Sequence, residues 1–308
     1  MESTSSSIFK FGRHGVKLFR VESNAAASSA DSYTPPPKPL LIASPCDEGD
    51  YAVVLFLHGY LLYNSFYSQL FQHVASHGFV VIGPQLYSIS GPDATEEIKS
   101  AGDVTDWLID GLSHVLPTQV RPILSKLSIA GHSRGGKVAF GLALGYTESR
   151  LKFSALMGID PVDGMDKGKQ TPPPILTHVP HSFDLKVPVM VVGSGLGEIR
   201  RNPLFPPCAP KGVSHKEFFD ECGSPSCYFV AKEYGHADML DDETKGIRGM
   251  ATYCLCKNGK AREPMRSFVG GIMVAFMKAY LEGDNKFLMA IRDDPEIAPV
   301  ELSTIAFL

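Results

Sequence analysis

The sequence predicts an α/β fold with a mostly parallel central sheet and helices on both faces. Past residue 38, short apolar runs alternate with longer amphipathic segments, which is the pattern of repeated strand–helix units. Several runs are almost continuous in valine, isoleucine and leucine, as expected for strands buried on both faces. The expected strands are 39–45, 51–59, 79–85, 126–132, 153–160, 187–195 and 227–235.

Four helical segments lie between or after these runs. Asp93 and Glu96 have the spacing of a capping box at the start of the second helix. The apolar segment that begins at Phe268 is too short to span a bilayer and contains Lys278, so it predicts a buried helix. The expected helices are 64–78, 94–116, 134–146 and 268–281.

Length and composition indicate one large globular domain. The chain has 308 residues, of which 44% are hydrophobic and 20% charged, enough for one sizeable core. We expect a single domain over 38–308, preceded by an N-terminal segment, 1–37. In that segment "GVKLFRVE" alternates like an edge strand, and 22–39 has the composition of a flexible linker. The net charge of −4 provides no basic surface for nucleic acid, so no nucleic-acid partner is expected.

The cysteines do not have the spacing of a metal site. Five of the six lie at Cys208, Cys222, Cys227, Cys254 and Cys256, and neither their C-x-C nor their C-x4-C spacing matches a zinc knuckle. We expect no metal and no cofactor. One or two local disulfides are predicted instead, with their pairing left open.

A glycine-bracketed serine follows the fourth expected strand and opens a helix. The stretch "GHSRG" covers 131–135 and places Ser133 at the centre of a G-x-S-x-G motif. In this context the motif forms a sharp turn in which glycines avoid clashes and the serine hydroxyl is exposed above the sheet. Ser133 is therefore predicted to be a nucleophile.

A nucleophilic serine needs a base and an orienting acid, which follow it in the chain in this architecture. His236 comes just after the last expected strand and before the closing helix, so it is the predicted base. For the acid we favour Asp160 at the end of strand 153–160. Glu198, after the next strand, and Asp163 stay open as alternatives.

Backbone N–H groups beside the serine would stabilise an oxyanion. An early strand is followed by His58, Gly59 and Tyr60, so the N–H of Tyr60 or Leu61, paired with that of Arg134, is expected to form the oxyanion and substrate-binding contacts. Three roles stay open for the Arg134 side chain: bracing the turn through an acidic residue, contacting a polar group of the substrate, or lying in solvent at the helix start.

Several longer stretches resemble the chlorophyllases, a plant family with the α/β-hydrolase fold, and the resemblance extends from about residue 38 onward. It implies hydrolysis of the phytyl ester of chlorophyll to chlorophyllide and phytol, with Ser133, Asp160 and His236 as the catalytic residues. It also implies chlorophyll as the small-molecule substrate, peripheral contact with the membranes that hold it, and a chloroplast location, with the cytosol or endomembranes as the alternative. No obligate protein partner is evident. The stretches are "FLHGYLLYNSFYSQL", "GHSRGGK", "GIDPVDG", "NPLFPPCAP", "EYGHADMLDD", "YCLCKNG" and "MRSFVGGI".

Without the resemblance, the residues predict only a serine ester hydrolase. A broader carboxylesterase or lipase, and a hydrolase-fold protein that binds a small molecule without catalysis, are the alternatives. Two long loops, 161–186 and 197–226, leave the sheet edge that carries the predicted triad. They predict either the walls of an apolar substrate pocket or plain surface loops.

Overall fold

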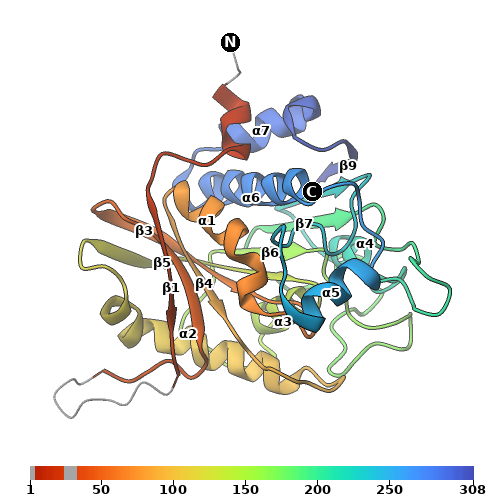
Figure 1. Ribbon diagram of the computed structural model, residues 1–308, viewed down its shortest axis with the longest axis horizontal. Coiled ribbons are helices and arrows are strands. Elements are labelled where there is room, and N and C mark those ends of the chain that lie inside the picture. Colours follow the sequence, from red (N-terminus) through yellow and green to blue (C-terminus); the bar gives the residue numbers. More distant parts are fainter. Residues whose placement is uncertain (1–3, 24–32) are drawn as a thin grey trace.

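The computed structural model describes residues 4–23 and 33–308, and within these residues one nine-stranded sheet runs through the molecule (Figure 1). Its strands are β1 (Val16–Val21), β2 (Leu40–Pro45), β3 (Gly49–Leu57), β4 (Phe79–Pro84), β5 (Val120–His132), β6 (Ala155–Ile159), β7 (Val189–Ser194), β8 (Ser226–Ala231) and β9 (Leu302–Phe307). The strand order is β1-β2-β4-β3-β5-β6-β7-β8-β9. The six strands β3 to β8 pair in parallel with one another, whereas β1, β2 and β9 are antiparallel to their neighbours. The predicted mostly parallel sheet is confirmed.

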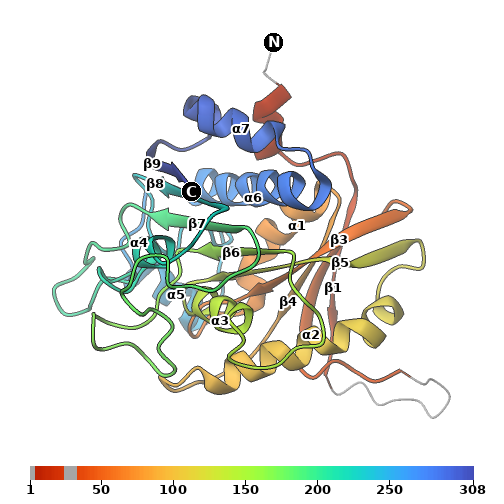
Figure 2. The same ribbon diagram turned by 180° about the vertical axis from the view of Figure 1, so that it is seen from behind.

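Helices cover both faces of the sheet, as predicted (Figures 1 and 2). One face packs against η1 (Thr4–Phe9), α1 (Ser68–Ser76), α6 (Glu263–Met277) and α7 (Lys286–Asp293), and the other against α2 (Thr95–Val115), α3 (Arg134–Ala143) and α4 (His215–Asp220). Neither hydrophobic core contains a residue of α5 (Gly246–Cys254). The short elements η2 (Asn64–Tyr67), η3 (Lys278–Glu282) and η4 (Pro295–Ile297) connect the larger ones.

The structure differs from the sequence-based expectations mainly at the edges of the sheet. Strand β5 begins at Val120 rather than at 126, and a register shift against β3 between Ala52 and Val53 accommodates the longer pairing. Strand β9 was not predicted, nor were α4, α5 and α7. β9 is half-exposed along most of its length, so it lacks the continuous apolar run of a buried strand.

The predicted capping box before α2 is wrong. The N-cap residue is Ala94, and Asp93 instead accepts the backbone N–H of Thr95 at 2.8 Å. This shift by one residue places Glu97, not Glu96, at the third helical position, where its side chain is buried.

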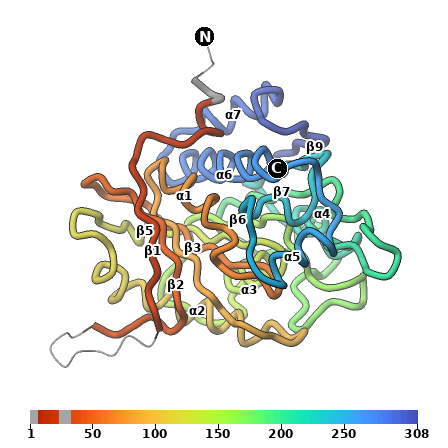
Figure 3. The backbone as a smooth tube through the Cα atoms, viewed as in Figure 1, coloured from red at the N-terminus to blue at the C-terminus, as the bar shows by residue number. Residues whose placement is uncertain are grey.

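The N-terminal segment packs against the domain on both sides of the sheet edge. Figure 3 traces it from η1, next to α6 and α7, down to β1. Ile8 and Phe9 are buried, the Phe9 ring stacks on that of Phe268 in α6 at 6.3 Å, and the N–H of Gly12 donates to the Ser76 hydroxyl at 2.7 Å. Of the linker predicted over 22–39, residues 24–32 lie outside the described part of the chain.

Three buried histidines are uncharged. Burial lowers the pKa of His58 and of His73 to about 4, and that of His132 to about 3. Two of them form hydrogen bonds with uncharged backbone groups. His73 Nε2 donates to the Ile8 carbonyl at 2.9 Å, and His58 Nε2 accepts the N–H of Leu86 at 3.1 Å. These rings therefore join separate segments only in their neutral form.

We expect the free energy of unfolding to fall as the pH is lowered from 7.5 to 5.5. The three histidines take up protons near pH 6.5 in the unfolded chain, whereas the folded protein holds them neutral, so unfolding binds protons in this window. Each histidine contributes a slope of up to about 1.4 kcal/mol per pH unit once its unfolded form is protonated. Urea unfolding at several pH values measures this slope. His73→Gln should reduce it, and the exposed His114→Gln should leave it unchanged. A free energy that stays constant across the window would contradict the expectation.

Candidate active site

At the turn around Ser133, the backbone of α3 lies very close to the backbones of β3 and β5. β5 ends at His132 and α3 begins at Arg134, with Ser133 between them at φ 57° and ψ −124°. A Cβ on Gly131 would lie 2.1 Å from the Gly135 carbonyl oxygen, and one on Gly135 would lie 2.2 Å from the Leu57 carbonyl oxygen. Only glycine fits at both positions, and the strained turn lifts the Ser133 side chain above the sheet.

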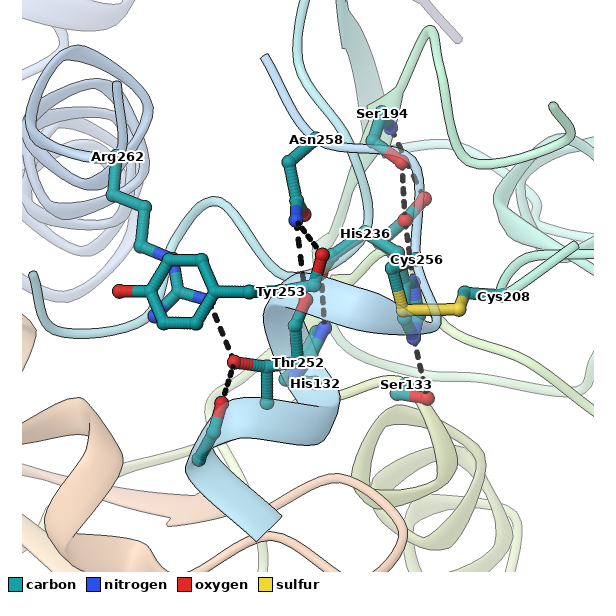
Figure 4. Close-up of a disulfide and its surroundings, with 12 residues drawn as sticks. His132, Ser133, Ser194, Cys208, His236, Thr252, Tyr253, Cys256, Asn258 and Arg262 are labelled. Carbon is teal, nitrogen blue, oxygen red and sulfur yellow. Dashed lines mark hydrogen bonds and ion pairs between the residues drawn. A yellow bond between two sulfur atoms is a disulfide. The ribbon is translucent and has the colours of Figure 1, made fainter. Parts of the chain in front are cut away.

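Ser133, His236 and Asp160 form a continuous chain of hydrogen bonds, of which Figure 4 labels Ser133 and His236. His236 Nε2 lies 2.8 Å from Ser133 Oγ, and His236 Nδ1 lies 2.7 Å from Asp160 Oδ2. Because the carboxylate can only accept, Nδ1 carries the proton and Nε2 is free to accept the serine proton. The arrangement can therefore deprotonate a serine hydroxyl as it attacks an ester.

Asp160 lies fully buried after β6, at φ 45°. Burial raises the pKa of its carboxyl group, but the hydrogen bond and charge of His236, together with His215 and Ser194, outweigh burial and lower the pKa to about 2. Ser194 donates both its N–H, at 3.0 Å, and its hydroxyl, at 2.5 Å, and His215 Nε2 lies 3.8 Å from Oδ1. The carboxylate is therefore ionised over the whole physiological range.

The two alternative acids lie elsewhere. Glu198 is exposed beyond the end of β7. Asp163 is buried, where it pairs with Lys137 Nζ at 2.7 Å and accepts the backbone N–H groups of Ile175 and Leu176, both at 2.9 Å. Asp163 thus anchors the following loop, and of the three candidates it is Asp160 that contacts His236.

His132 links the serine turn to the histidine loop. Its Nε2 lies 2.8 Å from the carbonyl oxygen of His236, and its Nδ1 lies 2.7 Å from the Tyr67 hydroxyl. Since a carbonyl only accepts, Nε2 must donate, and Nδ1 then accepts from Tyr67. The Tyr67 oxygen in turn accepts the N–H of Gly59 at 3.0 Å. This buried series fixes the backbone of His236 relative to the loop after β3.

Asp238 shapes the turn that carries His236. Its Oδ2 accepts the N–H of Gly235 and that of Gly259, each at 2.7 Å. Burial raises the pKa of its carboxyl group, while these two hydrogen bonds act in the opposite direction. Asp238 does not touch the imidazole in this arrangement, but it holds the backbone on either side of it.

The predicted oxyanion residues lie at the mouth of the site. Leu61 has a left-handed φ of 56°, within a turn closed by the N–H of Leu62 and the carbonyl of Gly59 at 3.1 Å. Tyr60 and Leu61 both border the same cavity as Ser133. Arg134 is the first residue of α3, so its N–H is one of those that the helix leaves without an internal acceptor.

The Arg134 side chain is turned into the protein. It forms a two-point ion pair with Glu97, with Nε and Nη2 at 2.9 and 2.6 Å from the carboxylate oxygens. It also donates to the carbonyls of Gly91 and Asp93, at 2.8 and 2.7 Å, and the Tyr60 ring lies over its guanidinium at 5.0 Å. Of the three roles left open by the sequence, these contacts match the first, in which the side chain stabilises the turn at Ser133 by pairing with an acidic residue.

An apolar cavity of about 470 Å³ opens next to Ser133 and His236. Its wall comes from the loop after β3 and from α5 with the residues that follow it, including Ile247, Ala251 and Leu255. The loop 161–186 contributes no lining residue, and the loop 197–226 contributes only Cys208. Of the two alternatives for these loops, pocket walls or plain surface loops, the first is therefore wrong. Asp163 ties the first of them down against α3 instead.

A disulfide borders this cavity. Cys208 and Cys256 are bonded, with Cα atoms 5.5 Å apart and a sequence separation of 48 (Figure 4), so one disulfide forms among the five clustered cysteines as expected, although it is not a local one. Cys46, Cys222, Cys227 and Cys254 are free. Among residues 4–23 and 33–308, no three histidine, cysteine or acidic side chains are gathered in a way that could hold a metal ion.

Several residues that support the site were not predicted. Ser194 ends β7 and could have been found as a polar residue at the carboxyl end of a strand adjacent to β6. Glu97 and Tyr67 carry no such signal, because each occupies a helical position whose partner is distant in sequence. The unpredicted residues in contact with the proposed triad or its neighbours are Tyr67, Glu97, Ser194, His215 and Asp238.

Comparisons with known proteins identify the family of the chain. Residues 4–308 match the family model named Chlorophyllase. The chain is 60% identical to Chlorophyllase-2 of Arabidopsis thaliana, with 97% of each chain covered. It is 47% identical to Chlorophyllase-1 of the same plant, over 87% of this chain and 84% of the relative, and 43% identical to "Chlorophyllase-1, chloroplastic" of Citrus unshiu, over 98% and 88%. The chain therefore belongs to the chlorophyllase family of carboxylic ester hydrolases, which have the α/β-hydrolase fold.

Proposed function

We propose that this protein hydrolyses the phytyl ester of chlorophyll, with Ser133 as nucleophile, His236 as general base and acid, and Asp160 as the orienting acid. The observation that carries the proposal is the hydrogen-bonded series of these three side chains, of which Ser133 and His236 line an apolar cavity. The names of the relatives in Arabidopsis and Citrus support chlorophyll as the substrate.

In the first half of the reaction, Ser133 Oγ attacks the ester carbonyl carbon while His236 Nε2 takes the hydroxyl proton. The carbonyl oxygen becomes an oxyanion, which the N–H groups of Arg134 and of Tyr60 or Leu61 would stabilise. His236 then returns its proton to the ester oxygen as the bond to it breaks. Phytol leaves, and the chlorophyllide acyl group stays on Ser133.

In the second half, water enters and gives a proton to His236 as its oxygen attacks the acyl carbon. Collapse of the second tetrahedral intermediate returns that proton to Ser133 Oγ and releases chlorophyllide as the free acid. Asp160 keeps the imidazole in one orientation throughout and balances its positive charge in both steps. Its low pKa, about 2, suits a group that must stay ionised.

The apolar cavity suits a lipid-like ester. Its lining is mostly aliphatic, from Leu61, Leu62, Ile247 and Leu255. Each CH2 group that moves from water into such a cavity contributes about 0.8 kcal/mol, so partial burial of a long alkyl chain would bind it well. A small ester gains little from this wall, which favours chlorophyll over the broader esterase alternative.

We also infer that the protein acts in the chloroplast. The support is that the Citrus relatives, at 43% identity, are named chloroplastic. The cytosol and endomembranes are the alternatives.

Ser133→Ala should abolish turnover of chlorophyll a and of p-nitrophenyl butyrate, because the attacking oxygen is lost. Loss of the nucleophile from such a unit lowers kcat on the order of 10⁶-fold. Absorbance assays of both substrates, a fluorophosphonate probe that should label only the wild type, and circular dichroism to confirm the fold make up the measurement. Activity within tenfold of wild type would rule out the proposed nucleophile, and failure of the folded wild type to react with the probe would favour a binding protein.

Asp160→Asn should lower kcat by roughly 10⁴, because the asparagine amide can hold the imidazole in the wrong tautomer and carries no charge. Glu198→Gln is the matched control, since it makes the same chemical change on an exposed acid after the neighbouring strand, and it should leave kcat within about twofold. Steady-state kinetics on both variants test the assignment. The reverse order of effects would transfer the acid role to Glu198.

Arg134→Gln should lower kcat/KM for chlorophyll a and for p-nitrophenyl butyrate by similar factors, and should also lower the melting temperature. The substitution leaves Glu97 buried without its cation, and breaking a buried pair typically costs about 3–5 kcal/mol. Glu97→Gln combined with Arg134→Gln should recover part of the stability. A loss confined to chlorophyll, with an unchanged melting temperature, would show that the side chain contacts the substrate instead.

A further inference from the structure

Large apolar side chains are exposed on α5 and on the loop of Cys208, two segments that contribute to the cavity lining. Ile247 and Met250 on α5 are 83% and 60% exposed, and Leu204 and Phe205 on the neighbouring loop are 85% and 46% exposed. Only Gly249 and Thr252 of α5 are buried, so most of this helix faces outward. A cluster of this kind at a cavity mouth indicates an interaction surface.

These residues belong to one continuous region. The disulfide between Cys208 and Cys256 joins the loop that carries Leu204 and Phe205 to the end of α5 (Figure 4). A backbone bridge between Arg200 and Cys256 joins the same two segments a second time. Ile247 is exposed and also lines the cavity, so the apolar surface continues from the outside into the pocket.

The two stretches that contain this loop and α5, residues 199–216 and 244–262, are strongly basic. No acidic residue occurs in 199–216 or in 244–262, although the chain as a whole has a net charge of −4. Of the cations, Arg262 is buried, whereas Arg200, Arg201, Lys245, Lys257 and Lys260 are exposed. The basic residues are Arg200, Arg201, Lys211 and Lys216 in the first segment, and Lys245, Arg248, Lys257, Lys260 and Arg262 in the second.

We propose that α5 and the loop 199–208 form a docking face for an anionic lipid membrane, with the cavity opening toward the lipid. Exposed apolar side chains surrounded by cations are the chemistry of interfacial membrane binding, in which apolar groups enter the acyl boundary and cations contact anionic headgroups. A second copy of this chain fits less well, because two such faces would bring their cations together. Within the described residues no helix could cross a bilayer, and the proposed face needs none.

Docking of this kind would let a lipid-soluble ester enter the cavity without crossing water. Ile247 and Leu255, which line the cavity and are exposed at its mouth, would provide the continuous apolar path. This consequence rests on the proposed function, whereas the docking itself does not.

Vesicle flotation of the catalytically inactive Ser133→Ala protein tests the docking without any turnover. Vesicles of phosphatidylcholine that contain phosphatidylglycerol as the anionic lipid are compared with vesicles of phosphatidylcholine alone. We expect binding to the anionic vesicles that is at least tenfold stronger and that weakens as salt screens the charges. Equal binding to both kinds of vesicle, or binding to neither, would overturn the proposal.

Two sets of substitutions locate the face. Leu204→Ser, Phe205→Ser and Met250→Ser together, and Arg200→Gln, Arg201→Gln and Lys257→Gln together, should each weaken binding to the anionic vesicles by at least tenfold. Phe11→Ser with Ile109→Ser removes exposed apolar side chains from the N-terminal segment and from α2, and should leave binding unchanged. Binding that survives both sets, or falls equally in the control, would place the docking face elsewhere or exclude it.

In the active background, the same substitutions separate docking from catalysis. None of the substituted residues lines the cavity, so hydrolysis of the water-soluble p-nitrophenyl butyrate should stay within about twofold of wild type. Hydrolysis of chlorophyll a in anionic vesicles should fall at least tenfold, and hydrolysis of chlorophyll a in detergent should not. A protein that binds vesicles but hydrolyses no chlorophyll would retain the docking face and refute the proposed function.

Discussion

The geometry of the site depends on how closely the backbone of α3 approaches β3 and β5 at the turn around Ser133. Gly131 and Gly135 permit carbonyl contacts that a Cβ would block. In this turn the Ser133 N–H reaches the carbonyl of Ile159 at 3.0 Å, which ties the serine to the end of β6. Asp160 is the next residue, so one backbone contact sets both the nucleophile and the position from which the acid approaches His236.

Two buried cations on the first turn of α3 connect this helix to neighbouring segments. Arg134 pairs with Glu97 at the start of α2, and Lys137 pairs with Asp163 after β6. A cation at a helix N-terminus is unfavourable against the helix dipole, and burial lowers the pKa of Lys137. Both costs are offset only because each cation has a carboxylate in contact. The pairs fix the start of α2 and the loop 161–186 against the helix that carries the turn, which explains why this loop is anchored rather than free to line the cavity.

The sequence was most informative about the central strands and about the reactive side chains that follow their carboxyl ends. The central strands were predicted because burial on both faces requires continuous apolar runs, and the residues now proposed as the triad were singled out because such groups follow the carboxyl ends of parallel strands. It was least informative where much of an element is exposed. β9 is half-exposed, and the exposed side chains of α5 include Ile247 and Met250, so its pattern of apolar residues does not mark a buried face. Glu97 and the disulfide partners depend on contacts between distant segments, which no local spacing reveals.

The buried series from Gly59 through Tyr67 and His132 to the backbone of His236 has a consequence for how such a sequence can diverge. Tyr67 both accepts the N–H of Gly59 and donates to His132, so losing its hydroxyl alone would orphan a donor on one side and an acceptor on the other. Changing His132 alone would free the Tyr67 proton and the His236 carbonyl in the same way. Replacement of both together by apolar residues of similar shape would still leave two groups unpaired, the Gly59 N–H and the His236 carbonyl, as many as either single change leaves. Positions 67 and 132, which lie 65 residues apart in sequence, should therefore both keep side chains that continue these hydrogen bonds, because loss of either or of both leaves the loop carrying the catalytic base less firmly held.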